Sequence, residues 1–511
     1  MNLTEIWRDN IKQFDPYPAL IYEDKEYTNV QCDRLSSQLA HALRNLGVEK
    51  GDRIVVTMPN CPEVIIAFGG ISKSGAVVVP VMPLLQAQEV RYILEDCQPR
   101  IVLTNDLLLP KVREAAKELP DPADIFTLEE LDSVTSLRKK MSHQPEEAPS
   151  VSIEDDDEAA LLYTAGTTGQ PKGVRLSHKN LYTNAKAAAK IAGVLTTKEG
   201  RVGLGLLPMS HAFGFTIMNT SLLLGDKDVL LPKFDPASTL EAIERYGVTH
   251  FAGVPAMFHG LYNHPAADQY DTSTLIACIS GSASLPRQLA TDFQRKFGCV
   301  ILEGYGLSEA APIVTATDPT KPFKPGSVGL PLEGIEVAVI DESGNRLPPN
   351  EAGELIVSGP NVTKGYLDRP EETGKILRDG WLHTGDMARI DEDGYVFIVD
   401  RKKDVIIRGG FNVYPRDLEE LLMTHPDVNE AGVVGTPSKR MGEEVVAYVV
   451  TDAGSKVTER ELIDFCQDQL AKYKTPRFLR IVNHIPKNLI GKTDKKQLRQ
   501  WAKTIDTASR T

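Results

Sequence analysis

Cysteine and tryptophan are scarce in this chain, and its start does not have the composition of an export signal. The 511 residues include six cysteines and three tryptophans. The cysteines form no Cys-x-x-Cys pair, which argues against a zinc site and against a disulfide framework. The N-terminus carries Glu5, Arg8 and Asp9 where a secretory signal would be apolar. We therefore expect reduced thiols and a cytoplasmic location.

Long uncharged stretches are also rare, and residues 202–225 form the one that could be mistaken for a membrane span. This stretch holds no Asp, Glu, Lys or Arg, but Pro208, His211 and Asn219 interrupt its apolar residues. A lipid-spanning helix would be continuous and more apolar, so we expect a buried strand, a loop and a helix. Basic runs interleaved with aromatic residues are absent too, which argues against a nucleic-acid partner.

Helical and strand patterns alternate over residues 1–400. An apolar helical face over residues 35–46 is followed by Gly47, and buried strands are expected at 53–58 and 76–81. Further strands are expected near 229–231, 249–254, 275–280 and 299–303. This alternation predicts an α/β fold whose large N-terminal domain has mostly parallel sheets covered by helices. The length of the chain predicts two or three domains.

From about residue 325 to 400 the pattern changes to short strands joined by glycine-rich turns. Segments 354–357 and 394–399 are examples. This pattern predicts a small β-barrel subdomain. Residues 140–158, which hold prolines and an acidic run, are expected to form an exposed linker.

The segment from Tyr163 to Gly173 places hydroxyls, glycines and a lysine directly after the apolar run 159–162. Glycines let backbone N–H groups approach an anion, and the hydroxyl and ammonium groups add donors. The segment therefore predicts a polyphosphate site, with a solvated surface turn as the alternative. A Walker loop is excluded because Lys172 follows Pro171 and precedes a glycine. The phosphate-binding candidates are Thr164, Ala165, Gly166, Thr167, Thr168, Gly169 and Lys172.

This segment resembles the phosphate-binding loop of the adenylate-forming superfamily, which includes acyl-CoA synthetases, luciferases and peptide-synthetase adenylation domains. Further blocks that resemble the family follow in its order at residues 304–309, 380–386, 400–404 and 486–492. The resemblance covers the chain from about residue 15 to 500. Within the family, the chain most resembles fatty acid–CoA ligases for medium or long chains.

The resemblance implies a two-step reaction on a fatty acid. ATP first converts the acid to an acyl-adenylate and releases pyrophosphate, and transfer to coenzyme A then gives acyl-CoA and AMP. The implied cofactors are ATP, Mg²⁺ and coenzyme A, and the fatty acid is the implied partner. Peripheral membrane association and a homodimer are left open.

The resemblance also implies the catalytic residues. Lys492 would bridge the substrate carboxylate and the α-phosphate once a mobile C-terminal domain closes over the large domain. Glu309, together with Thr164, would bind the magnesium ion, and Lys172 would contact the phosphates. His211 would position the substrate carboxylate, which is already ionised at neutral pH and needs no general base.

The resemblance also implies that residues from several of these blocks bind the nucleotide. Tyr305 would stack on adenine, Asp386 would accept hydrogen bonds from the ribose hydroxyls, and Arg401 would be a second ribose or phosphate contact. The other implied residues are Gly281, Ser282, Ala283, Glu303, Gly304, Gly306 and Ser308. Ser308 stands where the family usually has threonine, and its hydroxyl preserves the chemistry.

The resemblance places a hinge at Lys403. The hinge would divide the chain into an N-terminal AMP-binding domain, residues 1–400, and a small mobile α+β C-terminal domain, residues 401–511. After rotation of the small domain, Gly409, Gly410 and Phe411 would line the pantetheine tunnel, with a simple hairpin turn as the alternative.

Other functions share parts of this pattern. A CoA ligase for aromatic acids such as 4-coumarate and a luciferase-like acyl-adenylate monooxygenase both begin with adenylation. An amino-acid adenylation module would need a carboxylate to pair with the α-ammonium group, and residues 211–215 offer none. A non-catalytic nucleotide sensor is disfavoured because both Glu309 and Lys492 are present.

The candidate pocket segments indicate an apolar acid. Residues 204–225, 251–260 and 301–316 contain no Arg or Lys, so a dicarboxylate would lack a counter-charge. Each CH₂ group buried in an apolar slot would add up to ~0.8 kcal/mol of binding free energy. We therefore expect medium- to long-chain fatty acids as substrates. The slot candidates are Phe213, Phe215, Ile217, Met218 and Met257.

Overall fold

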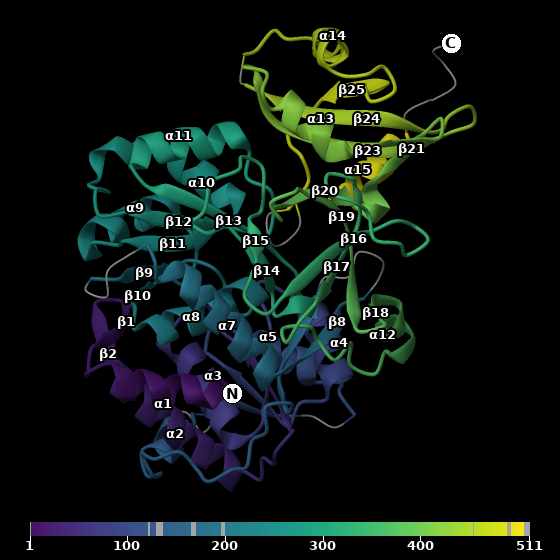
Figure 1. The fold of residues 1–511 in the computed structure, drawn as a ribbon. Helices are drawn as coiled ribbons and strands as arrows, with labels where there is room; N and C mark the ends of the chain where they lie inside the picture. Colours follow the sequence, from purple (N-terminus) through teal and green to yellow (C-terminus); the bar gives the residue numbers. More distant parts are fainter. Residues whose placement is uncertain are drawn as a thin grey trace.

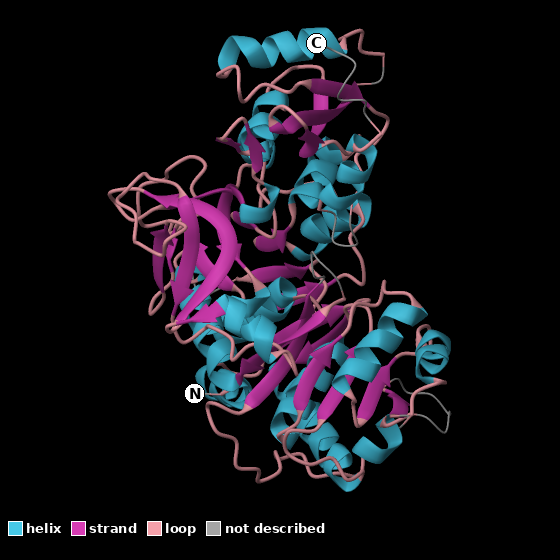
Figure 2. Ribbon diagram, turned by 90° about the vertical axis from the view of Figure 1, so that its right-hand side faces the viewer, coloured by secondary structure: helices cyan, strands magenta, loops and turns pink. Residues whose placement is uncertain are grey.

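The strands of the described residues form four sheets. The computed structural model describes residues 2–120, 123–128, 136–164, 170–195, 200–452, 454–487 and 492–504. Figure 1 shows the N-terminal elements as a large lower body, with the C-terminal elements above it in yellow-green and yellow. In Figure 2 the strands of the lower body lie between helices, which confirms the predicted α/β class.

The first sheet has six strands, in the order β6 (Asp124–Thr127), β5 (Ile101–Thr104), β3 (Arg53–Thr57), β4 (Val77–Pro80), β7 (Glu158–Thr164) and β8 (Lys172–Ser177). The first five run parallel and are mostly buried, as parallel strands covered by helices must be. The strands predicted at 53–58 and 76–81 are confirmed as β3 and β4. β8 runs antiparallel to β7, and this pairing sets Thr164 opposite Lys172.

The second sheet has nine strands, in the order β15 (Leu330–Pro331), β14 (Ile313–Ala316), β13 (Val300–Gly306), β12 (Ala277–Ser280), β11 (His250–Gly253), β9 (Val202–Gly205), β10 (Lys227–Leu230), β1 (Pro18–Tyr22) and β2 (Lys25–Thr28). From β13 to β1 the strands run parallel. The four strands predicted between residues 229 and 303 are confirmed. The uncharged stretch 202–225 is β9 followed by α8 (Ala212–Leu224), a buried strand and helix as predicted.

Helices cover both faces of the second sheet. α8 packs on one face, and α9 (Pro236–Tyr246), α10 (Pro255–Tyr262) and α11 (Arg287–Phe297) pack on the other, where Leu240 and Phe258 meet Leu204. α9 begins after Asp235, whose side chain accepts a hydrogen bond from the Ser238 N–H at 2.9 Å. The other helices of the lower body are α1 (Leu3–Gln13), α2 (Asn29–Asn45), α3 (Pro62–Ser74), α4 (Ala87–Cys97), α5 (Leu109–Ala116), α6 (Arg138–Met141) and α7 (His178–Ala192), with short 3₁₀ turns at Ala267–Gln269 (η1) and Ser308–Ala310 (η2).

The segment expected as a small β-barrel forms a five-stranded antiparallel sheet. Its strands are β16 (Glu336–Ile340), β17 (Gly353–Ser358), β19 (Trp381–Ile390) and β18 (Leu377–Arg378), with β20 (Val396–Arg401) paired to β19. α12 (Pro370–Ile376) lies beside β18 and β19. The pairing of β19 with β20 sets Asp386 opposite Arg401.

The C-terminal strands form a fourth sheet, which shares no described strand with the other three. Its order is β22 (Phe411–Val413), β21 (Ile406–Arg408), β24 (Gly442–Thr451) and β23 (Val428–Ser438), with β25 (Phe478–Ile481) paired to β24. A 3₁₀ turn at Lys402–Asp404 (η3) precedes it, and its helices are α13 (Pro415–Leu422), α14 (Glu459–Gln469) and α15 (Lys495–Ala502). This sheet has its own apolar cluster. The domain boundary at residue 400 and the hinge at Lys403 stay predictions.

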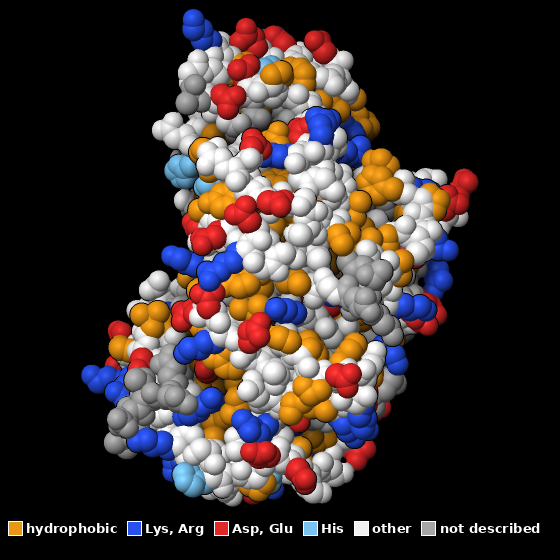
Figure 3. Space-filling view, turned by 90° about the vertical axis from the view of Figure 1, so that its left-hand side faces the viewer, with side chains coloured by type: hydrophobic (Ala, Val, Ile, Leu, Met, Phe, Trp, Pro, Cys, Tyr) orange, Lys and Arg blue, Asp and Glu red, His pale blue; other side chains and the backbone are white. Residues whose placement is uncertain are grey.

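The surface mixes charges of both signs. On the face drawn in Figure 3, Lys and Arg side chains lie interspersed with Asp and Glu over both the lower body and the upper part. Within the described ranges, no helix combines the length and the apolar character that crossing a membrane requires.

Gly329 connects the second sheet to the antiparallel sheet and should tolerate no side chain. Its φ is +88°, and an added Cβ would lie closer than 3.0 Å to the backbone of Ala316. Gly344 has a similar φ, +86°, but an added Cβ there would have nothing within 4 Å. We expect Gly329→Ala to lower the free energy of unfolding by about 3 kcal/mol and Gly344→Ala by about 1 kcal/mol. Paired denaturation curves test this difference, and equal losses would contradict it.

Candidate active site

Asp386 lies at the junction between the lower body and the C-terminal elements. The Tyr305 hydroxyl donates to its Oδ2 at 2.6 Å, and Arg401 Nε lies 3.5 Å from its Oδ1. Burial raises the pKa of Asp386, while Arg401, Tyr305 and Lys492 oppose that rise. The sequence-predicted residues Tyr305, Asp386, Arg401 and Lys492 are therefore brought together.

Lys492 reaches this junction from the C-terminal part of the chain. Burial lowers the pKa of its ammonium group to about 8, with Arg401 lowering it further and Asp386 opposing. Lys492 also interacts electrostatically with His211, which belongs to the lower body. A cation from near the end of the chain thus lies between a carboxylate of β19 and the start of α8.

His211 is the residue that caps α8. Its Nδ1 accepts a hydrogen bond from the Phe213 N–H at 3.3 Å. Burial, and then Lys492, lower the pKa of the imidazole to about 4, so the ring is neutral at pH 7. A neutral ring that faces a cation can hold a ligand by hydrogen bonds, which agrees with the predicted positioning role.

Gly281, Ser282 and Ala283 form the turn that follows β12. A Cβ added to Gly281 would lie 2.9 Å from the Phe213 ring, so the turn packs directly on the start of α8. Ser282 has a positive φ of 69°. Next to this turn and to His211, the hydroxyls of Ser280 and Ser210 are buried and have no hydrogen-bond partner among the described residues. Such hydroxyls are suited to a polar ligand.

Glu303, Gly304 and Gly306 lie on β13, and Ser308 begins the turn η2 that follows it. A Cβ on Gly306 would lie closer than 3.0 Å to the Pro312 carbonyl, so only glycine fits this approach between β13 and β14. Burial raises the pKa of Glu303, and Arg416 opposes the rise. Arg416 also contacts the Ser284 hydroxyl and donates to the Ile398 carbonyl at 2.7 Å, which ties α13 to the lower body.

Glu309 and Lys172 meet through a tyrosine that the sequence analysis missed. The Tyr366 hydroxyl donates to Glu309 Oε1 at 2.7 Å, and the Lys172 ammonium group lies 5.1 Å from the centroid of the same ring. Lys172 also forms an ion pair with Glu372 of α12. Neither Tyr366 nor Glu372 belongs to a recognised block, so no motif could have identified them.

The donors near Glu309 fit a magnesium ion that is held mainly by phosphates. Among the described residues, no group of three or more His, Cys, Asp or Glu side chains could hold a metal ion. Mg²⁺ commonly takes one or two protein carboxylates and fills its remaining positions with water and substrate phosphates. Glu309 could supply that carboxylate and Thr164, at the end of β7, a hydroxyl. The predicted phosphate ligands Ala165, Gly166, Thr167, Thr168 and Gly169 lie outside the described residues.

The residues predicted to bind CoA lie on a hairpin. Gly409 and Gly410, with φ of +59° and +86°, form the turn between β21 and β22. Phe411 is 57% exposed, and its ring centroid lies 4.9 Å from that of Tyr473. Lys403 lies in η3, where burial lowers its pKa. The local structure is therefore the hairpin turn that was given as the alternative. The roles of Gly409, Gly410 and Phe411 in CoA binding, and of Lys403 as a hinge, stay predictions.

A cavity of about 40 Å³ lies between α8 and the second sheet. The helix contributes Gly214, Ile217, Met218 and Ser221, whose spacing places them on one face. Ile217 and Met218 were predicted for an apolar slot, whereas Phe215 packs on Phe68 with ring centroids 5.1 Å apart. The sheet contributes residues of four of its strands, which are Gly203, Leu204, Gly205, Asp228, Leu230, His250, Phe251, Ala252 and Ile279.

Comparison with known proteins gives the family of the chain. The pattern described as AMP-binding enzyme matches residues 7–367, and the AMP-binding enzyme C-terminal domain matches residues 417–492. The chain belongs to the AMP-binding enzyme family. The two matched ranges cover nearly the same part of the chain as the resemblance found in the sequence.

The relatives of this AMP-binding enzyme include ligases for two kinds of acid. It is 38% identical to a long-chain-fatty-acid–CoA ligase of Bacillus subtilis (strain 168), over 97% of this chain and 94% of that one. It is 34% identical to 4-coumarate–CoA ligase 1 of Solanum tuberosum, over 96% and 92%. Among solved structures, ATP-bound MatB from Rhodopseudomonas palustris matches with a TM-score of 0.90 at 31% identity, over 99% of both chains. Apo MatB matches with a TM-score of 0.81.

The pKa of Lys492 gives a testable pH dependence. Because burial lowers that pKa to about 8, the free enzyme should lose this positive charge as the pH rises through about 8. The kcat/KM for ATP reports groups of the free enzyme, so it should fall over the same interval. Lys492→Arg keeps its charge there, and its profile should stay flat whatever its absolute rate. The same decline in both proteins would contradict this assignment.

Proposed function

We infer that this AMP-binding enzyme activates a fatty acid with ATP and transfers the acyl group to coenzyme A. The observation that carries the proposal is that Lys492 interacts electrostatically with both Asp386 and His211, which caps the helix that lines the cavity. The full-length similarity to a long-chain-fatty-acid–CoA ligase supports the same conclusion.

In the first step, the fatty acid carboxylate attacks the α-phosphorus of ATP and pyrophosphate leaves. Lys492 lies where it could neutralise charge on both the carboxylate and the α-phosphate, and His211, as a neutral imidazole, could orient the carboxylate. Lys172 would leave its ion pair with Glu372 to contact the phosphates. Mg²⁺, when bound near Glu309 and Thr164, supplies further neutralisation of the phosphate charge.

The adenosine site would use the residues around β13 and β19. We propose that Asp386 accepts the ribose hydroxyls, with the Tyr305 hydroxyl and Arg401 holding its carboxylate in place. The buried hydroxyls of Ser280 and Ser210 would gain partners when nucleotide and acid bind. The higher TM-score to ATP-bound than to apo MatB supports an orientation suited to this first step.

In the second step, the thiolate of coenzyme A attacks the acyl carbon and AMP leaves. We propose that the C-terminal elements turn about Lys403 and bring Gly409, Gly410 and Phe411 to the pantetheine. Glycines at +59° and +86° permit close approach of a ligand to the backbone. The six cysteines are free, and a cytoplasmic location agrees with that and with the use of ATP and coenzyme A. Homodimer formation and peripheral membrane association stay predictions.

An aromatic acid is the second candidate substrate. The observation in its favour is the 34% identity to 4-coumarate–CoA ligase 1 of Solanum tuberosum over nearly the full chain. The cavity beside α8 favours the fatty acid, because its aliphatic lining, with Ile217, Met218 and Leu230, suits packing along a hydrocarbon chain.

The products separate this proposal from other uses of ATP. With a fatty acid, ATP and coenzyme A, the purified protein should form AMP and pyrophosphate in equal amounts with acyl-CoA. Comparing kcat/KM for acetate, octanoate, palmitate and 4-coumarate tests the substrate class, and a medium- or long-chain acid should give the highest value. Formation of ADP would contradict the reaction, and a maximum at acetate or 4-coumarate would contradict the fatty acid.

Removing the cation at position 492 should affect the first step alone. Lys492→Ala should slow acyl-adenylate formation about 10²- to 10³-fold, as expected for loss of a group that stabilises transition-state charge. Thioester formation from supplied acyl-adenylate and coenzyme A should be largely retained. Lys496→Ala, an exposed lysine of α15, is the matched control and should leave both steps unchanged. Equal losses in both half-reactions would show that Lys492 does not have this role.

A further inference from the structure

The cavity beside α8 has a polar end. Gly214, Ile217, Met218 and Ser221 face it from the helix, and His211 caps the same helix beside the reaction centre. Ser221 is ten residues beyond His211, which corresponds to ~15 Å along an α-helix. An extended medium-chain acyl group that starts at His211 would therefore end near Ser221.

Asp228 is the acidic side chain at this end of the cavity. Strand pairing aligns Asp228 of β10 with Gly203 of β9, and Gly203 with His250 of β11. A Cβ on Gly203 would lie closer than 3.0 Å to Asp228 Oδ1 and 3.2 Å from His250 Nε2. The Asp228 carboxyl group thus occupies the space over Gly203 that a side chain there would fill, and from this position it lines the cavity.

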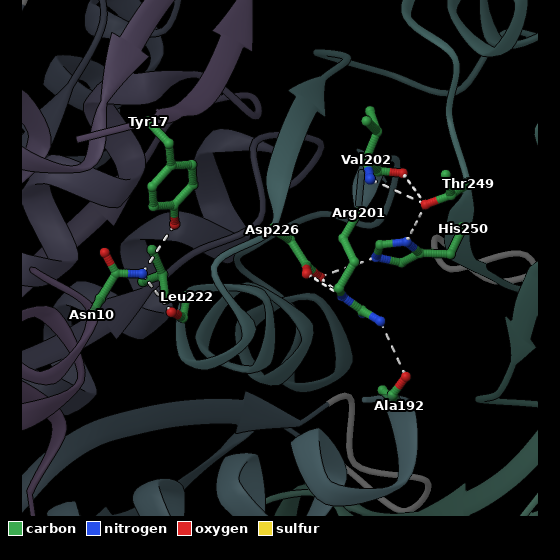
Figure 4. A network of polar contacts seen from close by, with 9 residues as sticks. All are labelled: Asn10, Tyr17, Ala192, Arg201, Val202, Leu222, Asp226, Thr249 and His250. Atoms are coloured by element: carbon green, nitrogen blue, oxygen red, sulfur yellow. Dashed lines mark hydrogen bonds and ion pairs between the residues drawn. The ribbon is translucent and has the colours of Figure 1, made fainter. Parts of the chain in front are cut away.

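The neighbouring residue Asp226 binds the side chains of Arg201 and His250. Arg201 forms an ion pair with Asp226, with Nη2 at 3.2 Å from Oδ2, and His250 Nε2 lies 3.1 Å from the same oxygen. Figure 4 shows Arg201 and His250 converging on Asp226, with His250 held from behind by Thr249 at 3.0 Å. The charge of Asp226 is therefore compensated inside the protein.

The carboxyl group of Asp228 lies in a different environment from that of Asp226. Burial, and then repulsion from Asp226, raise its pKa to about 7, while His250, a hydrogen bond from Ser221 and Arg201 oppose that rise. Its carboxyl group faces the cavity together with the Ser221 hydroxyl. A cavity of about 40 Å³ exceeds the volume that one water-sized group needs.

A plain hydrocarbon tail would suit this end poorly. Its terminal methyl group would lie against the Asp228 carboxyl group and the Ser221 hydroxyl and could form a hydrogen bond with neither. A terminal hydroxyl could donate to the Asp228 carboxylate or to the Ser221 oxygen, or accept from a protonated carboxyl group. The apolar path is completed by Met218 and Ile217, and methionine adapts readily to an acyl chain.

We propose that Asp228 and Ser221 form a subsite for a hydroxyl group at the far end of the acid, so that the enzyme prefers medium-chain ω-hydroxy fatty acids to the unsubstituted acids of equal length. This substrate class rests on the proposed CoA ligase activity. The preference comes from one hydrogen-bonding group about 15 Å from the reacting carboxylate.

The test compares each ω-hydroxy acid from octanoate to tetradecanoate with its parent acid, by kcat/KM in the CoA ligase assay. The wild-type enzyme should favour the hydroxy acid about 10-fold at the best length, which corresponds to ~1.4 kcal/mol. Asp228→Leu keeps a branched side chain without hydrogen-bonding atoms and should favour the parent acid. Asp228→Asn, which still bonds a hydroxyl, should retain most of the preference.

Two controls make the result specific. Thr220→Ala changes a buried residue of α8 that does not line the cavity and donates to the Thr216 carbonyl at 2.9 Å. It should leave the hydroxy-to-parent ratio unchanged. Turnover of butyrate, which is too short to reach Asp228, should be similar in all variants and shows that each is folded.

The outcomes distinguish the two proposals. If no acid in the series yields acyl-CoA, the CoA ligase function itself is wrong. If parent acids yield acyl-CoA but the hydroxy-to-parent ratio is the same in wild type and Asp228→Leu, the hydroxyl subsite is wrong while the ligase function stands. A wild-type preference for the parent acid at every length would also overturn the subsite.

Discussion

The active site depends on the balance of charges around a buried ammonium group, that of Lys492. Lys492 shares the junction with Arg401, and the carboxylate between them, Asp386, already accepts a hydrogen bond from Tyr305. The lowered pKa of Lys492 reflects this balance, because burial and a neighbouring cation both disfavour the charged form. An anionic ligand would relieve the repulsion. The junction is thus suited to an acid and a nucleotide phosphate together, and its polarity is set before either binds.

The same balance explains why a neutral histidine stands opposite Lys492. An imidazolium would add a third positive charge in a buried place, and burial together with Lys492 lowers the pKa of His211 to about 4. Its Nδ1 is also committed to the Phe213 N–H at the start of α8. The ring orientation is therefore fixed by the helix cap. The residue can orient a carboxylate but cannot serve as a cationic partner for it at neutral pH.

Sequence patterns predicted the elements better than the contacts between them. The strands at 53–58 and 76–81 depend on local composition and were found correctly. Tyr366, which joins Glu309 to Lys172, was missed because it acts through tertiary contact and lies in no motif. Phe215 was placed in the slot but packs on Phe68. α8 is apolar on all sides, so its sequence could not indicate which face lines the cavity.

The lining of the cavity beside α8 depends on two glycines of β9, and this becomes apparent only once the neighbouring strands are paired with β9. Gly203 and Gly205 face α8 from β9, and a Cβ on Gly205 would lie 2.8 Å from Leu230 Cδ2. A side chain at either position would collide with a residue of β10, Asp228 over Gly203 and Leu230 over Gly205. Because β9 is flanked by β10 and β11, the absent side chains let Asp228 and His250 lie over Gly203 and line the cavity. The glycine spacing of one strand therefore decides which neighbouring side chains line the cavity, and it places a carboxyl group among them.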